Sequence, residues 1–123
     1  MKKLQIVTNN PKFIGYHNFL IDFNEDGFLD VLYRVRNLIH KNYKILTHPL
    51  YGNITPTTTL YRSIVVEKVN YLDMESVYLI EDSIQKVERI IKLEKHRIFP
   101  DSIKEDLEFI DYTLIKETLD QIL

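Results

Sequence analysis

Three polar residues, Thr8, Asn9 and Asn10, directly follow a short apolar run, and their side chains could bind an anion. Pro11 comes next, a residue that favours the first position of a helix, and an Asn before it commonly caps that helix. Free backbone N–H groups at a helix start attract carboxylates and phosphates. The spacing therefore predicts a polar ligand site at this turn, with an ordinary capped turn as the alternative.

His48 opens a second polar segment, residues 48–60, which has the periodicity of neither a helix nor a strand. A structureless loop of about a dozen residues is uncommon in a small domain and is often functional. A histidine there could exchange a proton near neutral pH, although it could equally hydrogen-bond within its own loop. Further candidates come from the same stretch of chain: Asn53, Thr55 and Tyr61 as ligand-binding residues, and Tyr51 as a cover for the ligand or a core residue.

Several other chemistries lack the residues they need. The chain has no Cys, which removes disulfides, thiol nucleophiles and thiolate zinc sites. The three Gly, at positions 15, 27 and 52, are too far apart for either of the common Gly-rich phosphate loops, and the four His have no metal-ligand spacing. No Ser lies in a nucleophile elbow. We therefore expect no metal and no cofactor.

Composition also limits the partners. A net charge of −2 argues against a nucleic-acid partner, which would favour a basic face. No apolar run approaches the roughly 20 residues of a membrane span, and the N-terminal apolar run is too short for a signal peptide. We expect a cytoplasmic protein that forms one α/β domain over residues 1–123, with its helical part at 73–123.

Apolar spacing predicts alternating strands and helices. The expected strands are 4–7, 20–23, 43–47 and 63–67, and the expected helices are 11–20, one beginning at 28, one beginning after an Asp73 cap, and a terminal one. This order favours a small Rossmann-like three-layer fold with four mostly parallel strands in the order 2-1-3-4. Because no helix connects strands three and four, an antiparallel fourth strand is the main alternative.

The predicted strand order suggests where a ligand would bind. In open α/β sheets, ligands bind beyond the carboxyl ends of the strands, where the strand order reverses. In the order 2-1-3-4 this crevice lies between strands one and three. Residues 8–10 would line one side and residues 47–49 the other, so Asn9 and His48 should share one edge of the sheet.

Two long helices end the chain. The first carries an apolar stripe at Val77, Ile80, Ile84, Val87 and Ile91, and the second at Ile103, Leu107, Ile110, Leu114 and Ile122. Ser102 and Glu105 have the spacing of a capping box, which would start the second helix. Helices of about 30 Å overhang a four-stranded sheet. We expect a homodimer through them, with pairing of the two helices inside one chain as the alternative.

Two sequence blocks resemble a known family. The segment 6–11, Ile-Val-Thr-Asn-Asn-Pro, and the segment 48–56, His-Pro-Leu-Tyr-Gly-Asn-Ile-Thr-Pro, followed by Thr59 to Ile64, resemble the GrdX family. The resemblance covers roughly residues 4 to 95. It implies a setting among the glycine, sarcosine and betaine reductase systems of anaerobic, amino-acid-fermenting bacteria. The family's molecular role is unassigned, so the resemblance implies no catalytic residue.

Two functions from different classes follow. The first is an accessory protein that binds a reductase-system protein or a small anionic metabolite. The alternative is a small enzyme in which His48 acts as general acid or base, with Asn9 or Asn10 donating to an oxyanion. A deep polar cleft around His48 would favour a small ligand or an enzyme, whereas a flat surface there would favour a protein partner.

Overall fold

The structure is a computed structural model that describes residues 3–16, 19–51, 59–93 and 99–122. Four strands form one sheet: β1 (Leu4–Thr8), β2 (Leu20–Phe23), β3 (Tyr43–Ile45) and β4 (Ser63–Lys68). Three long helices cover it: α1 (Phe28–Ile39), α2 (Met74–Leu93) and α3 (Asp101–Ile122), and a short 3₁₀ turn, η1 (Pro11–Phe13), follows β1. The predicted α/β class with two long C-terminal helices is confirmed.

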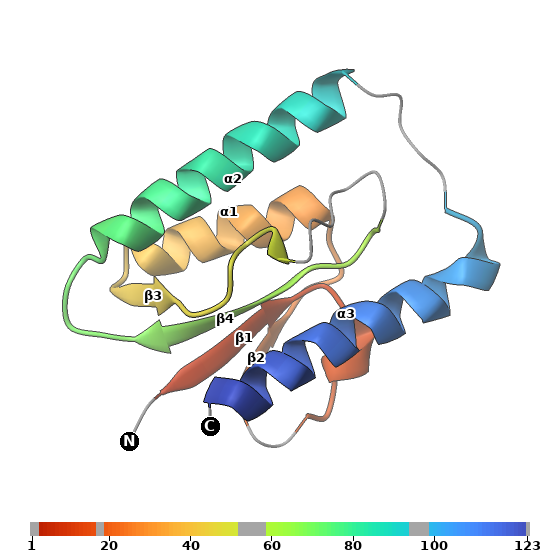
Figure 1. Cartoon of the computed structure of the whole chain (residues 1–123), viewed down its shortest axis with the longest axis horizontal. Helices are drawn as coiled ribbons and strands as arrows, with labels where there is room; N and C mark the ends of the chain where they lie inside the picture. The colour runs from red at the N-terminus through yellow and green to blue at the C-terminus, as the bar shows by residue number, and fades with distance from the viewer. Residues whose placement is uncertain (1–2, 17–18, 52–58, 94–98, 123) are drawn as a thin grey trace.

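The elements form three layers (Figure 1). Helices α1 and α2 pack side by side on one face of the sheet, and α3 crosses the other face. The predicted pairing of the two terminal helices within one chain is therefore wrong, because α2 and α3 lie on opposite faces of the sheet. Among the described helices none is long and apolar enough to cross a membrane.

The strand order differs from the prediction. The sheet runs β2-β1-β4-β3, and only the β1–β2 pair is parallel, because β4 pairs antiparallel with both β1 and β3. The antiparallel alternative for the fourth strand is correct, whereas the mostly parallel, Rossmann-like sheet is not. Ile64, Val65 and Val66 explain the central place of β4, because all three are fully buried between the two helical layers.

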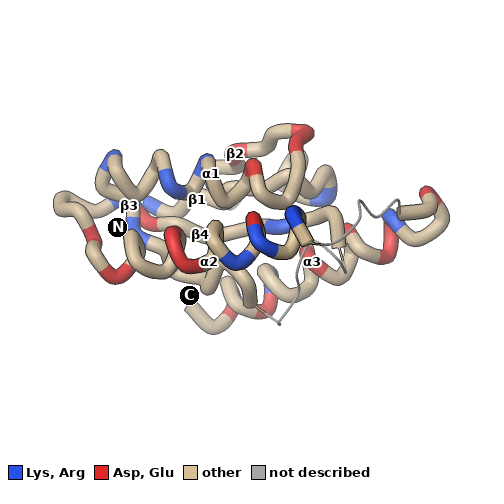
Figure 2. The backbone as a smooth tube through the Cα atoms, turned by 90° about the horizontal axis from the view of Figure 1, so that it is seen from above, with Lys and Arg blue, Asp and Glu red and all other residues tan. Residues whose placement is uncertain are grey.

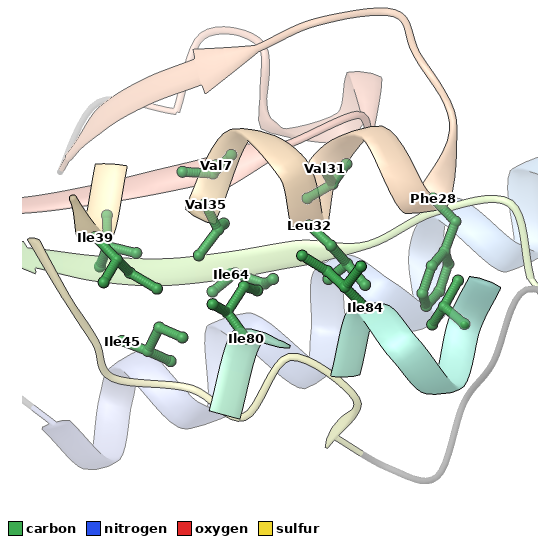
Figure 3. Close-up of a cluster of buried hydrophobic side chains, with 12 residues drawn as sticks. Val7, Phe28, Val31, Leu32, Val35, Ile39, Ile45, Ile64, Ile80 and Ile84 are labelled. Carbon is green, nitrogen blue, oxygen red and sulfur yellow. The ribbon is translucent and has the colours of Figure 1, made fainter. Parts of the chain in front are cut away.

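Two apolar clusters hold the layers together. One lies between the sheet and the helices α1 and α2, where Val31, Leu32 and Val35 meet Ile80 and Ile84 (Figure 3). These are the positions that the helical period predicts for both helices. The second cluster lies between the sheet and α3, and it contains Ile6, Phe13, Val65, Ile115 and Leu119.

Two local predictions need correction. The expected helix over 11–20 is only the turn η1, because the chain takes a left-handed conformation at Gly15 (φ 83°) and then enters β2. The expected capping box of Ser102 and Glu105 is also wrong: α3 begins at Asp101, so Ser102 lies inside its first turn and cannot cap it. The predicted cap of α2 is confirmed, since Asp73 Oδ2 accepts the backbone N–H of Ser76 at 3.1 Å.

The buried side of α3 is not the predicted stripe. Asp111, Ile115 and Leu119 face the sheet, whereas Ile110 is 47% exposed. A polar residue therefore occupies the first of the three buried positions, and a pattern read from apolar residues alone misses that position. The three buried residues all lie in the second half of the helix. The first half of α3, residues 101–110, contains no buried side chain.

Candidate functional site

The polar edge of the sheet lies where β1 ends and β4 begins. Thr8 is the partner of Ser63 in the β1–β4 register, and their hydroxyl oxygens lie 2.6 Å apart. Thr8 Oγ1 also accepts the backbone N–H of Asn10 at 2.9 Å. Because β4 is antiparallel to β1, the amino end of one strand and the carboxyl end of the other meet here.

Asp111 of α3 closes this edge from the helical side. Its carboxylate accepts three hydrogen bonds: from Asn10 Nδ2 at 3.0 Å, from the Ser63 hydroxyl at 2.6 Å and from the Tyr51 hydroxyl at 2.5 Å. Only 2% of Asp111 is exposed, so these donors replace water around a buried charge. We call Thr8, Asn10, Tyr51, Ser63 and Asp111 the edge cluster.

The hydroxyl of Tyr51 is kept protonated by this arrangement. Burial raises its pKa above the ordinary value, and the neighbouring Asp111 carboxylate raises it further. Tyr51 therefore acts as a hydrogen-bond donor that links its loop to α3.

Asn9 ties three segments of backbone together. Its Nδ2 donates to the carbonyl oxygens of Asp26 and Leu60, both at 2.9 Å, and its Oδ1 accepts the N–H of Arg62 at 2.9 Å. Asn10 is used in the same way, because its Nδ2 donates to the Glu108 carbonyl and to Asp111, and its Oδ1 accepts the N–H of Lys12 at 3.0 Å. The predicted ligand-binding amides thus bond to the protein itself.

The structure brings Thr8, Asn9 and Asn10 together but leaves His48 apart. His48 follows β3, at the same edge of the sheet as Asn9, yet β4 lies between β1 and β3. The predicted crevice between strands one and three is therefore filled by a strand. His48 is exposed, and its Nδ1 accepts the N–H of Leu50 at 2.9 Å, the contact within its own loop that was the alternative.

The remaining predicted site residues divide into two groups. Tyr61 lies beside the edge cluster, and its hydroxyl donates to Glu108 Oε2 at 3.0 Å. Burial, with a further contribution from Glu108, raises the pKa of Tyr61 to about 12. Asn53 and Thr55 lie outside the described residues.

The helix start predicted as an anion site is a capped turn. Asn10 caps η1 through its Oδ1, which takes up one of the N–H groups that an anion would have used. A turn of three residues also carries too few aligned peptide dipoles to attract an anion. At Asn10 and Pro11 the structure therefore has the ordinary capped turn that was the alternative to an anion site.

Arg62, like Asp111, is a residue of this region that sequence reasoning missed. Its side chain has no exposed surface, and its guanidinium carbon lies 3.9 Å from the ring centre of Tyr51 and 5.2 Å from that of Phe28. Nη1 donates to the carbonyl of Tyr51 at 3.2 Å and, at the longer distance of 3.5 Å, to that of Pro49. Within the described part of the chain, Nε and Nη2 are buried and have no hydrogen-bond partner.

The charge of Arg62 is only partly compensated. Burial lowers the pKa of its guanidinium, and the nearby Tyr51 and Asp111 act in the opposite direction. No Asp or Glu of the described residues lies within ion-pair distance of it. A weak sequence signal exists, because Arg62 lies directly before a predicted strand with the unbroken apolar run Ile64 to Val66, which is typical of a strand buried on both faces.

The chain matches a known protein family over most of its length. Residues 5–120, nearly the whole chain, match the family described as GrdX-like protein. Neither curated proteins nor solved structures give a significant match. Within the described ranges, no group of three or more His, Asp or Glu side chains is arranged to hold a metal ion. The edge cluster and Arg62 lie inside the matched region, and the chain belongs to the GrdX-like family.

Proposed function

We propose that this chain is an accessory protein of a glycine, sarcosine or betaine reductase system and that it binds a small anion at Arg62. The setting follows from membership of the GrdX-like family. The observation that carries the anion is the buried guanidinium whose Nε and Nη2 lack hydrogen-bond partners within the described residues. A buried charge with unpaired donors is costly, and an anion placed against them would recover that free energy.

The surroundings of Arg62 favour a binding role over a purely structural one. Only one of its three nitrogens is needed to hold the loop carbonyls of Pro49 and Tyr51. Phe28, whose ring lies beside the guanidinium, is the first residue of α1, and the positive end of the α1 dipole adds to the attraction for an anion. Because Arg62 is enclosed, binding requires local opening around the half-buried Tyr51, so association should be slow.

Thermal unfolding in a series of anions tests this function. Chloride, acetate and inorganic phosphate are compared at constant ionic strength, and an anion that binds the folded state raises Tm with the logarithm of its concentration. The effect should disappear in Arg62→Gln, which removes the positive charge. It should persist in Arg36→Gln, because Arg36 of α1 is already paired with Glu81. If no anion raises Tm in the wild-type protein, the proposal that this protein binds a small anion at Arg62 is wrong.

A second candidate function is docking of a reductase-system protein on α3. The first half of this helix projects beyond the sheet in both views (Figures 1 and 2), and Phe109 is 60% exposed there. The adjacent Ile110 is 47% exposed, and neighbouring exposed apolar side chains favour a protein contact. The predicted homodimer would use the same surface, with a second copy as the partner.

Purified reductase components and size measurements distinguish these partners. Phe109→Ser should abolish capture of a reductase component, whereas Tyr78→Ser, at a 70% exposed residue of α2, should leave it unchanged. A monomeric mass at tens of micromolar would overturn the homodimer, and unchanged capture by Phe109→Ser would overturn docking on α3.

The enzyme alternative has less support. A general acid or base needs to lie within hydrogen-bond reach of the reacting group. The Nδ1 of His48 is used by Leu50 N–H, and the amides proposed to bind an oxyanion donate to backbone carbonyls and Asp111. In any activity found, His48→Ala should therefore leave turnover unchanged.

A further inference from the structure

We propose that the anion held by Arg62 is a monoanionic carboxylate, whose two oxygens accept hydrogen bonds from Nε and Nη2. This inference rests on the proposed function and names the ligand class of that site. The guanidinium has three nitrogens, and only one of them donates to the described residues of the protein. Nη1 donates to both loop carbonyls, those of Pro49 and Tyr51. Nε and Nη2 are left free within the described residues.

The two free nitrogens form one edge of the guanidinium. In arginine, the N–H of Nε and one N–H of Nη2 are parallel and coplanar, and they form the fork that a carboxylate accepts in bidentate fashion. Tyr51 covers a face of the guanidinium at 3.9 Å, so a ligand must approach in the plane of the group. A planar ligand with two oxygens on one carbon suits this approach.

The balance of charge favours one negative charge over two. Arg62 supplies one positive charge, and the nearby Asp111 already places a carboxylate on the far side of Tyr51. A monoanion would neutralise the guanidinium, whereas a phosphate dianion would bring a second charge into an enclosed region. Removing an uncompensated charge from water is strongly unfavourable even after relaxation.

The number of donors points to the same class. A desolvated phosphate needs partners for three or more oxygens, and among the buried side-chain atoms of the described residues around Arg62 only Nε and Nη2 lack a hydrogen-bond partner. Asn9 and Asn10 offer nothing further, because their Nδ2 groups already donate twice each. The rings of Phe28 and Tyr51 provide apolar surroundings that suit a short hydrocarbon substituent.

The test uses wild-type protein with acetate and inorganic phosphate as probes, at matched ionic strength. A pH of about 8 keeps phosphate mostly dianionic. The readout is the NMR signal of the Arg62 Nε–Hε pair, together with Tm. Acetate should shift this signal and raise Tm, and phosphate should need at least about tenfold higher concentration for the same shift, which corresponds to about 1.4 kcal/mol.

Two variants identify the origin of the effect. Arg62→Lys keeps the positive charge but lacks the planar fork, so it should lose the preference for acetate over phosphate. Arg36→Lys, at a residue whose Nε and Nη2 already bind Glu81, should respond like the wild type. If Arg62→Lys does not fold, the wild-type titration alone remains decisive, because it follows the Arg62 signal directly.

The outcomes separate this inference from the proposed function. If phosphate shifts the Arg62 signal as well as acetate does or better, the carboxylate class is wrong and anion binding stands. If neither probe shifts the Arg62 signal, both are wrong. If acetate raises Tm without shifting the Arg62 signal, the carboxylate binds elsewhere and the inference is likewise overturned.

Discussion

The guanidinium carbon of Arg62 lies 3.9 Å from the centre of the Tyr51 ring, and the hydroxyl of that ring donates to the Asp111 carboxylate. Tyr51 therefore separates a buried cation from a buried anion and contacts both. A phenol that donates to a carboxylate has a more electron-rich ring, which strengthens its attraction for the cation. Through this one side chain, the loop after β3, the start of β4 and the middle of α3 are held together.

Tyr51→Phe should destabilise the protein without removing the contact with Arg62. The ring stays in place, but Asp111 loses a donor while it remains buried. We expect a loss of about 1–3 kcal/mol in the free energy of unfolding, the usual effect of removing a hydrogen bond to a buried charged group. Urea denaturation measures this loss, and hydrogen exchange should show faster opening of α3.

Tyr33→Phe is the matched control for this change. The Tyr33 hydroxyl donates to Glu88 at 3.3 Å on the exposed surface between α1 and α2. Its removal should change the free energy of unfolding by no more than about 0.5 kcal/mol. Equal losses in the two variants would mean that the edge cluster does not depend on the Tyr51 hydroxyl.

Arg34 should matter far more to stability than its neighbour Arg36. Arg34 donates to the carbonyls of Thr8 at 2.8 Å and Asp22 at 3.0 Å, and it pairs with the Asp26 carboxylate at 3.1 Å. Arg34→Leu removes all three contacts and leaves the partly buried Asp26 carboxylate without its cation, although the Thr8 carbonyl keeps the N–H of Asn24 at 3.1 Å. We expect a loss of about 2–4 kcal/mol.

Arg36→Leu provides the comparison, because it removes the same side chain from the same helix. Arg36 pairs with Glu81 at 2.7 Å, but both side chains are more than one-third exposed, at 35% and 40%. The loss should be about 1 kcal/mol or less. Chemical denaturation of both variants measures the difference, and the reverse ranking would contradict the assignment of Arg34 as the residue that joins α1 to β1 and β2.

The parts of the fold that follow from local pattern were predictable. The apolar stripe of α1 and the Asp73 cap of α2 depend on interactions between residues three or four apart. Such local interactions can be recognised from the sequence alone. The place of β4 depends on pairing between distant segments. A loop without a helix allowed the fourth strand to turn back, and the buried run Ile64 to Val66 then favoured the centre of the sheet.

The candidate site shows the same division. The sequence placed Thr8, Asn9 and Asn10 at the end of β1, which the structure bears out. It could not reveal that their polar atoms bond to Leu60, Glu108 and Asp111, since those partners lie 51 to 101 residues away. Asp111 was missed for a related reason: an acidic residue between apolar ones on a helix resembles a solvated position until its distant donors are known.

The pH dependence of stability should contain a contribution from Tyr61. Burial, followed by the Glu108 carboxylate, raises its pKa to about 12 in the folded protein, against about 10 in an unfolded chain. Folding therefore favours the protonated phenol. Its contribution to stability is fully present below about pH 10 and is lost as the pH rises through about 12.

Tyrosine labelled with ¹³C at Cζ measures the titration of Tyr61, and Tyr61→Phe assigns its signal. Glu108→Gln should lower the pKa of Tyr61, because it removes the negative charge of the carboxylate that accepts the hydrogen bond of the phenol at 3.0 Å. Glu105→Gln, on the same helix, leaves that contact intact and should have little effect. The assignment would be wrong if the phenol titrated at its ordinary pKa in the wild-type protein.

A matched pair of substitutions on α3 tests which side of this helix faces the sheet. Ile115 is fully buried and Ile110 is 47% exposed, although the apolar spacing alone predicts that Ile110 belongs to the buried stripe. Ile115→Ala should cost about 2–5 kcal/mol, because it leaves a cavity against Ile6 and Val65. Ile110→Ala should cost less than about 1 kcal/mol, since its side chain already contacts water. Urea denaturation measures both. A larger loss for Ile110 would mean that α3 is rotated about its axis, which would also withdraw Asp111 from the Tyr51 and Ser63 hydroxyls.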